Sequence, residues 1–222
     1  PPLAEQQRIA AVLREQMAAV DKARAAAQAR LEAVKALPAA YLRQVFPQPG
    51  QPLPDGWRWV KLGQVIRDAQ AGFACGERDP DGIAQLRMNN LDTRGNFVWD
   101  TVLRVPREGS DVEAFLLQPG DVLFNNTNST ALVGKSALFT GYIEPIVYSN
   151  HFTRIRTATD RLLPDVLASW LNHQWTQGVF AAICNRWIGQ SAVKADKLLN
   201  LELPLPPLAE QQRIAAVLRE QM

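Results

Sequence analysis

PPLAEQQRIAAVLREQM occupies residues 1–17, and the same sequence returns without a change at 206–222. A shared helical constraint would leave solvent-facing positions such as Gln6, Gln7 and Glu15 free to vary. The identity therefore indicates a duplicated genetic element, and the 205-residue offset between the copies is the length of one module. Solenoid proteins need at least three repeats of about 20–50 residues. We predict one globular module between two copies of a connector.

Composition is that of an ordinary soluble chain. With 222 residues and 47% hydrophobic content, the chain is long enough for one core plus an accessory element. It shows neither a signal peptide nor an apolar run of about 18 residues, which predicts a cytoplasmic protein without a membrane anchor. Cys75 and Cys184 lack Cys or His neighbours at ligand spacing, so we expect neither a metal site nor a disulfide framework.

Net charge does not by itself indicate a nucleic-acid partner. Residues 47–205 carry 15 Lys and Arg against 16 Asp and Glu. A DNA-binding face would therefore have to come from the way these charges are sorted in space.

The N-terminal segment is predicted to form a long helix. Leu3 to Leu37 contains no Gly or Pro, and its seam residues alternate in steps of four and three, which is a heptad pattern. We expect a rod of roughly 50 Å that ends at Pro38. The alternative is an amphipathic helix lying on its own domain. The seam residues are Leu13, Met17, Val20, Arg24, Ala27, Leu31 and Val34.

The two connectors should lie antiparallel, because one arrives at the globular domain and the other leaves it. The second is shorter and would cover only the domain-proximal half of the first, which predicts a partner site on the uncovered apolar stripe. The predicted helix–helix interface consists of Ile9, Leu13, Met17, Val20, Leu31 and Val34.

The central part is predicted to be β-rich, which makes the chain an α+β protein. A Pro-rich hinge at Gln48–Asp55 precedes it, and a helix over Asp165 to Ile183 follows the strands, with Pro164 in its first turn. Strands are expected at 57–62, 83–88, 97–105, 121–124, 136–139 and 146–156, separated by turn signals.

The order of sequence motifs resembles a known family, the specificity subunit of type I restriction-modification systems. The matching segments cover nearly the whole chain, and the closing one, a polar loop followed by a short helix, a Pro-rich strand and a helix start, is the most specific. They are GWRWVKLGQV (56–65), QLRMNNLD (85–92), LQPGDVLFNNTNS (117–129), VGKSALF (133–139), YSNHFTRIR (148–156) and IGQSAVKADKLLNLELPLPPLAEQQRIAAVL (188–218).

The resemblance implies a domain organisation. Subunits of this family have two target recognition domains, each similar to the DNA-reading domain of adenine methyltransferases, joined by two helical conserved regions that form an antiparallel coiled coil. Residues 1–46 would be one conserved region, 47–55 a linker, 56–205 a target recognition domain and 206–222 the start of the next conserved region. The chain departs from the family pattern because it has a single recognition domain and stops within the second helix.

The resemblance also implies a function. We expect a sequence-specific DNA reader that enters the major groove over a short half-site, with methyltransferase subunits, a restriction subunit and a second recognition domain as partners. The second recognition domain would come from homodimerisation or from a longer subunit. Nothing in the sequence resembles a cofactor loop, an amino-methyltransferase tetrapeptide or a nuclease core, so we expect a non-catalytic chain, with S-adenosylmethionine bound by the methyltransferase subunit. The alternatives are a coiled-coil scaffold and the recognition portion of a fused methyltransferase-nuclease.

Polar and basic loops supply the candidate DNA-binding residues. Asn and Gln amides suit an adenine edge, and Lys suits a phosphate, although Asn and Ser also favour turns after strands. His151 and His173 lack partners for metal or catalytic work, and Ser129 stands where a phosphate loop requires Gly. The candidates are Arg87, Asn89, Asn90, Asn125, Asn126, Thr127, Asn128, Ser129, Lys135, Asn150, His151, Arg154, Trp187, Gly189, Gln190, Ser191, Lys194 and Lys197.

Overall fold

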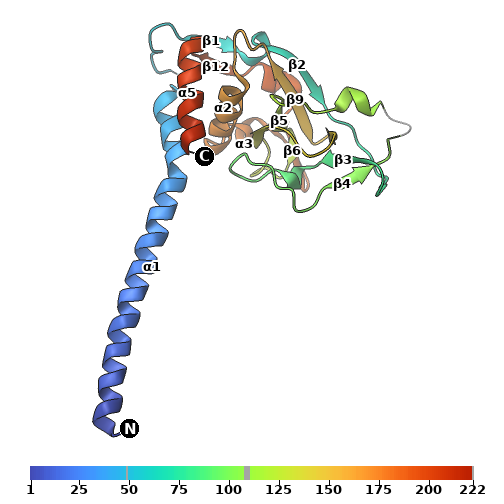
Figure 1. The fold of residues 1–222 in the computed structure, drawn as a ribbon. Helices are drawn as coiled ribbons and strands as arrows, with labels where there is room; N and C mark the ends of the chain where they lie inside the picture. The colour runs from blue at the N-terminus through green and yellow to red at the C-terminus, as the bar shows by residue number, and fades with distance from the viewer. Residues whose placement is uncertain (49, 108–110, 222) are drawn as a thin grey trace.

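The protein consists of a long helical rod and a globular β-rich domain (Figure 1). The structure, a computed structural model, describes residues 1–48, 50–107 and 111–221. The rod is α1 (Leu3–Val45), and α5 (Leu208–Gln221) lies beside its domain-proximal part. The predicted α+β class is confirmed. The linker predicted at 47–55 includes Pro49, which lies outside the described residues.

The prediction that the rod ends at Pro38 is wrong, because α1 continues through Pro38 to Val45. Proline cannot donate the hydrogen bond that residue 38 would make to the carbonyl of Val34. Burial offsets this loss, since Leu42 and Phe46 both enter the main core of the domain. Tertiary packing therefore decides where the helix ends.

The strands of the domain form small sheets. A four-stranded antiparallel sheet at the centre has the order β2-β9-β5-β7, and the order β4-β3-β8 forms a second sheet in which β3 and β8 are parallel. These strands are β2 (Ile66–Ala71), β3 (Ile83–Leu86), β4 (Leu103–Val105), β5 (Val122–Asn125), β7 (Ser136–Leu138), β8 (Ile146–Tyr148) and β9 (Phe152–Thr157).

Hydrophobic cores cover both faces of the central sheet. Val122 and Phe124 of β5 pack in the main core with α2 (Pro164–Thr176), whereas Leu123 packs in a second core with Leu86 and Tyr148. Successive side chains of a strand point to opposite faces, so β5 is buried on both faces and its first three residues are all apolar.

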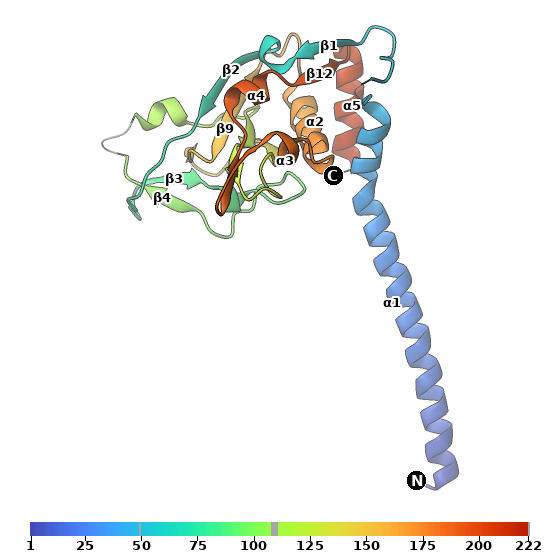
Figure 2. The ribbon, with the colours of Figure 1, turned by 180° about the vertical axis from the view of Figure 1, so that it is seen from behind.

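A further sheet closes the domain. In it, β1 (Arg58–Lys61) pairs antiparallel with β12 (Glu202–Leu205), so that Arg58 lies opposite Leu205. This pairing brings the start and the end of the domain together, and both connector helices therefore meet the domain on the same side (Figures 1 and 2).

Several predicted elements have different bounds in the structure. The strand expected at 97–105 is reduced to β4, because Phe97 makes only an isolated bridge with Leu91. The strand expected at 146–156 is divided into β8 and β9 by a turn at Ser149–His151. The helix expected to reach Ile183 breaks at Gly178, whose φ of 75° is left-handed, and resumes as α3 (Val179–Ile183).

Candidate nucleic-acid interface

Two polar loops that are distant in sequence form a single sheet. The hairpin of β10 (Asn185–Trp187) and β11 (Gln190–Ala192) pairs with β6 (Thr127–Asn128), so that Ser191 lies opposite Asn128. The hydroxyls of Thr130 and Ser191 lie 2.7 Å apart, and the Val193 amide donates to the Asn126 carbonyl. The Asn-rich loop and the Gly-Gln-Ser loop are therefore one structural unit.

Asn125 holds this unit on the domain. Its side chain is fully buried, and its Nδ2 donates to the carbonyls of Thr127 at 3.0 Å and His151 at 2.9 Å. Its Oδ1 accepts a bond from Asn128 Nδ2 at 2.6 Å. A buried amide with all these partners fixes the loop relative to the turn after β8.

The parallel pairing of β3 with β8 adds a third segment. Leu86 lies opposite Tyr148, and the Ser149 amide donates to the Leu86 carbonyl at 2.9 Å. Arg87 and His151, which follow these strands, therefore lie near each other. Burial lowers the pKa of His151, and the positive charge of Arg87 lowers this pKa further. The imidazole is thus favoured in its neutral form.

A close helix–loop contact supports the base of the Asn-rich loop. Trp175 of α2 donates through Nε1 to the Ala131 carbonyl at 3.1 Å. Gly134 has a φ of 97°, and a Cβ atom there would lie 2.2 Å from the Phe180 ring. Only glycine fits this position without strain.

Together these segments make up what we call the interface face: residues 87–90, 125–130, 149–151 and 185–194. Hydrogen bonds link them in turn. The Ser149 amide donates to the Leu86 carbonyl, Asn126 Nδ2 donates to the Asn150 carbonyl, and β6 pairs with β11. The helices α2 and α3 support the base of this face, because Trp175 of α2 bonds to the Ala131 carbonyl and Phe180 of α3 packs against Gly134.

Comparison with known proteins identifies the family. Residues 105–220, just over half of the chain, match the family described as the type I restriction modification DNA specificity domain. The chain belongs to this family. The match includes the Asn-rich loop, the turn at 149–151 and the hairpin, and excludes Arg87 and α1.

Relatives of the specificity domain are longer proteins. The type I restriction enzyme MjaVIII specificity subunit of Methanocaldococcus jannaschii is 25% identical over 174 residues, which cover 75% of this chain and 40% of that subunit. A solved chain of a type I R-M system, from work on its complex assembly and conformational transition, has a TM-score of 0.71 and 26% identity, covering 99% of this chain and 52% of that one. The HsdS subunit from Thermoanaerobacter tengcongensis has a TM-score of 0.68 and 26% identity, covering 100% and 51%. The chain thus spans about half the length of these solved chains.

Five of the predicted DNA-binding residues are buried, and in the structure their polar groups bond within the protein instead of facing a ligand. The ammonium group of Lys135 reaches inward to the Leu91 carbonyl, and burial lowers its pKa. Arg154 pairs with Asp68 across the central sheet. Asn90 donates to the carbonyls of Val98 and Thr101 at 3.0 and 2.8 Å. The buried candidates are Asn90, Asn125, Lys135, Arg154 and Ser191.

Some half-buried candidates are also committed to internal bonds. Asn126 Nδ2 donates to the Asn150 carbonyl at 3.2 Å and to Thr153 Oγ1 at 3.1 Å, so both amide hydrogens are used. Lys197 donates to the Ile183 carbonyl and to Asn185 Oδ1. These side chains position the hairpin and the Asn-rich loop. The half-buried candidates are Arg87, Asn126, Thr127, Asn128, His151 and Lys197.

The remaining candidates are exposed and lie on the interface face. The exposed candidates are Asn89, Ser129, Asn150, Trp187, Gly189, Gln190 and Lys194. Sequence reasoning missed Ile188, which is 105% exposed at the hairpin tip beside Trp187, 59% exposed. An apolar residue next to Gly in a polar segment was the available signal. The exposed residues remain predictions for DNA contact.

Neither a metal-type cluster nor a membrane-spanning helix is found among the described residues. Within 1–48, 50–107 and 111–221, we find no cluster of three His, Cys, Asp or Glu side chains placed to hold a metal ion. The helices of the same residues include none that is both long and apolar enough to cross a bilayer.

Proposed function

We propose that the chain reads a short DNA half-site through the interface face, as the recognition part of a type I restriction-modification specificity subunit. The supporting observation is the hairpin that exposes Trp187 and Gln190 beside the Asn-rich loop, in a domain of this family. Amide side chains distinguish adenine in the major groove, whereas Lys194 and Arg186 suit phosphates. Base reading would come from the exposed tip and positioning from the buried amides.

The chain is proposed to be non-catalytic. Its relatives are named as specificity subunits of restriction enzymes, which supports a division of labour in which other subunits perform the chemistry. Methyltransferase subunits, carrying S-adenosylmethionine, and a restriction subunit would be the protein partners. A second recognition domain would read the other half-site, and the connector helices would set its distance.

The test begins with the target, which sequencing of methylated adenines identifies in cells that carry the intact system. Binding of the full chain is then measured by fluorescence anisotropy on a duplex with that half-site and on a scrambled duplex. Gln190→Ala should weaken specific binding by about 1–3 kcal/mol, because a base contact is lost. Lys194→Ala should weaken binding to both duplexes and lower the salt slope by about one.

Lys61→Ala is the charge-matched control, because Lys61 is exposed on β1, outside the interface face, and bonds to Asn200. It should leave both affinities unchanged within about twofold. Equal loss of specific and nonspecific binding for Gln190→Ala would remove this residue from the base-reading set. Equal affinity of the unmodified chain for the duplex with the half-site and for the scrambled duplex would contradict the proposed function itself.

A further inference from the structure

The hairpin of β10 and β11 ends in an exposed apolar tip. Trp187 pairs with Gln190, which leaves Ile188 and Gly189 as a two-residue turn. Ile188 is 105% exposed, the highest value among the large apolar side chains of the described residues. A Cβ atom at Gly189 would have no neighbour within 4 Å. The tip therefore stands clear of the rest of the domain.

The base of the hairpin, in contrast, is held in place. Arg186 Nη2 donates to the Ala181 carbonyl at 2.9 Å, and Lys197 Nζ donates to Asn185 Oδ1 at 3.2 Å. The other strand of the hairpin, β11, pairs with β6. A side chain on a hairpin that is ordered in advance loses less conformational entropy when it binds. A small contact area at the tip can therefore contribute measurably to affinity.

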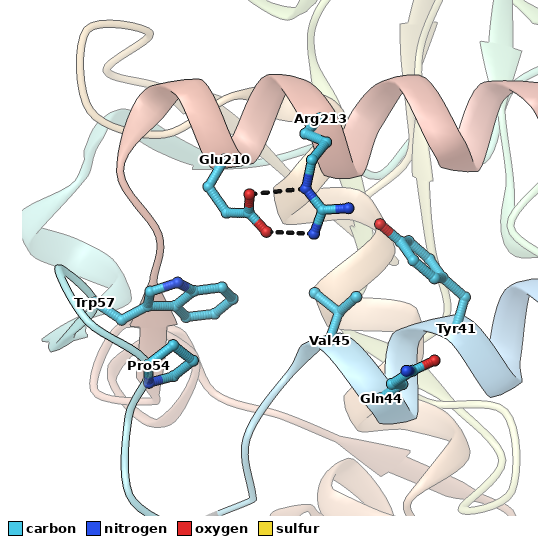
Figure 3. A pocket seen from close by; sticks show the side chains of 7 residues that line it. All are labelled: Tyr41, Gln44, Val45, Pro54, Trp57, Glu210 and Arg213. Atoms are coloured by element: carbon cyan, nitrogen blue, oxygen red, sulfur yellow. Dashed lines mark hydrogen bonds and ion pairs between the residues drawn. The ribbon is translucent and has the colours of Figure 1, made fainter.

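The charges around the tip suit a polyanion. The four segments of the interface face contain no Asp or Glu. The pocket lined by residues of α1 and α5 is different, because the Glu210–Arg213 ion pair at 2.6 Å faces Trp57 there (Figure 3). A face with cations and without carboxylates is complementary to a phosphate backbone. The cations of the interface face are Arg87, Arg186 and Lys194.

An isoleucine that faces the major groove has one apolar group to contact. Base edges present hydrogen-bond donors and acceptors there, and the apolar group is the C5-methyl of thymine. Gln190, on the other side of Gly189, carries an amide that suits adenine. The rise of about 3.4 Å per residue in a strand is close to the spacing of about 3.4 Å between base pairs. The two side chains can therefore reach the same base pair or its neighbour.

We propose that Ile188 contacts the C5-methyl group of a thymine in the half-site and so determines specificity at that base. This inference rests on the proposed function and deepens it, because it assigns one chemical group of the DNA to one side chain. A duplex is the occupant because the tip continues the carboxylate-free interface face. Ile143 shows the contrast: it is 90% exposed but lies outside this face, next to Glu144, which pairs with Arg104.

The test removes the methyl group from the DNA. Each thymine of the half-site duplex is replaced in turn by deoxyuridine, which keeps the base pairing, and binding of the full chain is measured by fluorescence anisotropy. At one thymine the replacement should weaken binding by about fourfold, as expected for one buried methyl-sized group. Ile188→Ala should weaken binding to the thymine duplex by at least as much. This variant should bind the thymine and uracil duplexes equally at that position.

Three further variants separate this contact from general effects on binding. Ile143→Ala is the matched control, because it shortens an equally apolar exposed side chain away from the interface face. It should distinguish thymine from uracil as the unmodified chain does, and so should Gln190→Ala. Ile188→Leu, which keeps the apolar volume, should retain most of the discrimination. Circular dichroism checks that each variant is folded.

Two results would overturn the thymine contact. One is an unmodified chain that binds the thymine and uracil duplexes equally at every position. The other is an Ile188→Ala chain that keeps the full difference between them, which would assign the methyl contact to another residue. Preference for the half-site over the scrambled duplex would persist in both results, so the proposed function would stand. Loss of that preference in the unmodified chain would contradict the proposed function, and this inference with it.

Discussion

At the scale of single residues, the interface face contains two kinds of polar side chain. Some are buried and hold the loops in place, and others are exposed to solvent. Asn125 is fully buried and bonded through both ends of its amide, whereas Ser129, four residues later, is exposed. Both are polar residues of one turn-forming segment, so their residue types alone predict the same role. Burial distinguishes them, because a buried amide without partners is costly and a solvated hydroxyl is not.

Asn125→Ala should therefore lower the free energy of unfolding by about 1–3 kcal/mol, because the carbonyls of Thr127 and His151 lose their donor. Urea unfolding followed by circular dichroism measures the change. Ser129→Ala is the neighbouring control and should stay within about 0.5 kcal/mol of the unmodified chain. An Asn125→Ala chain of undiminished stability would mean that this amide does not hold the loop.

Gly134→Ala tests the packing beneath the Asn-rich loop. Gly120 has the same φ of 97° but no neighbour within 4 Å of a Cβ atom, whereas Gly134 faces Phe180. Gly120→Ala should cost about 1–2 kcal/mol from the left-handed backbone alone. Gly134→Ala should cost about 1–3 kcal/mol more, from overpacking. Thermal unfolding of the two variants gives the difference. Equal losses of stability would show that the Phe180 ring moves aside without cost.

At the scale of elements, the C-terminal end of α1 packs into the core of the domain. Phe46 stacks on His173 of α2 with ring centroids 6.2 Å apart, and His173 is 1% exposed. Burial lowers the pKa of His173 below its usual 6.5, and the charge of Arg43 lowers it further. Sequence periodicity predicted both helices, but the contact that carries α1 past Pro38 joins residues more than 120 positions apart.

The docking of α1 should weaken in acid. Above about pH 6.5, His173 is neutral in the folded and unfolded states; below it the unfolded chain takes up a proton that the folded chain resists, so stability falls as pH falls. The Phe46 amide donates to the Leu42 carbonyl. Its protection factor, the ratio of the intrinsic to the observed hydrogen-exchange rate, should fall as the pH is lowered from about 7 to about 5. His173→Gln should remove this dependence.

His151→Gln is the comparison variant, because His151 also has a lowered pKa but lies on the interface face. It should leave the pH response of the Phe46 amide intact. A response that survives His173→Gln and vanishes in His151→Gln would place the titrating group at the wrong end of the domain for this explanation.

At the scale of the whole molecule, the β1–β12 pairing lets one helix enter and the other leave on the same side of the domain. The exposed length of α1 then extends away from the domain as a rod (Figure 1). Such a rod is suited to fix the distance between two recognition domains, which is the role that the proposed function gives it.

Insertion of seven residues between Val20 and Asp21 tests this ruler. One heptad preserves the seam and lengthens the rod by about 10 Å, which corresponds to roughly three base pairs of 3.4 Å. In a complete complex whose paired helix is lengthened to match, methylation of the same half-sites should occur across a longer spacer. A four-residue insertion, which rotates the seam, should tolerate fewer spacers. Sequencing of methylated adenines measures the spacing, and an unchanged spacer in an active complex would contradict the ruler.

The sequence by itself determined the elements whose signals are local. The duplicated connector, the heptad pattern of α1, the late helix beginning at Pro164 and most short strands follow from periodicity and turn residues, because these depend on neighbours a few positions away. The order of motifs also predicted the family. Only the tertiary structure decided which polar residues are buried, since Lys135 and Leu91, or Asn125 and His151, meet through chain separations that no local pattern encodes. The repeat shows the limit directly: identical residues are exposed at Ile9 and buried at Ile214, because burial depends on the surface that a helix meets.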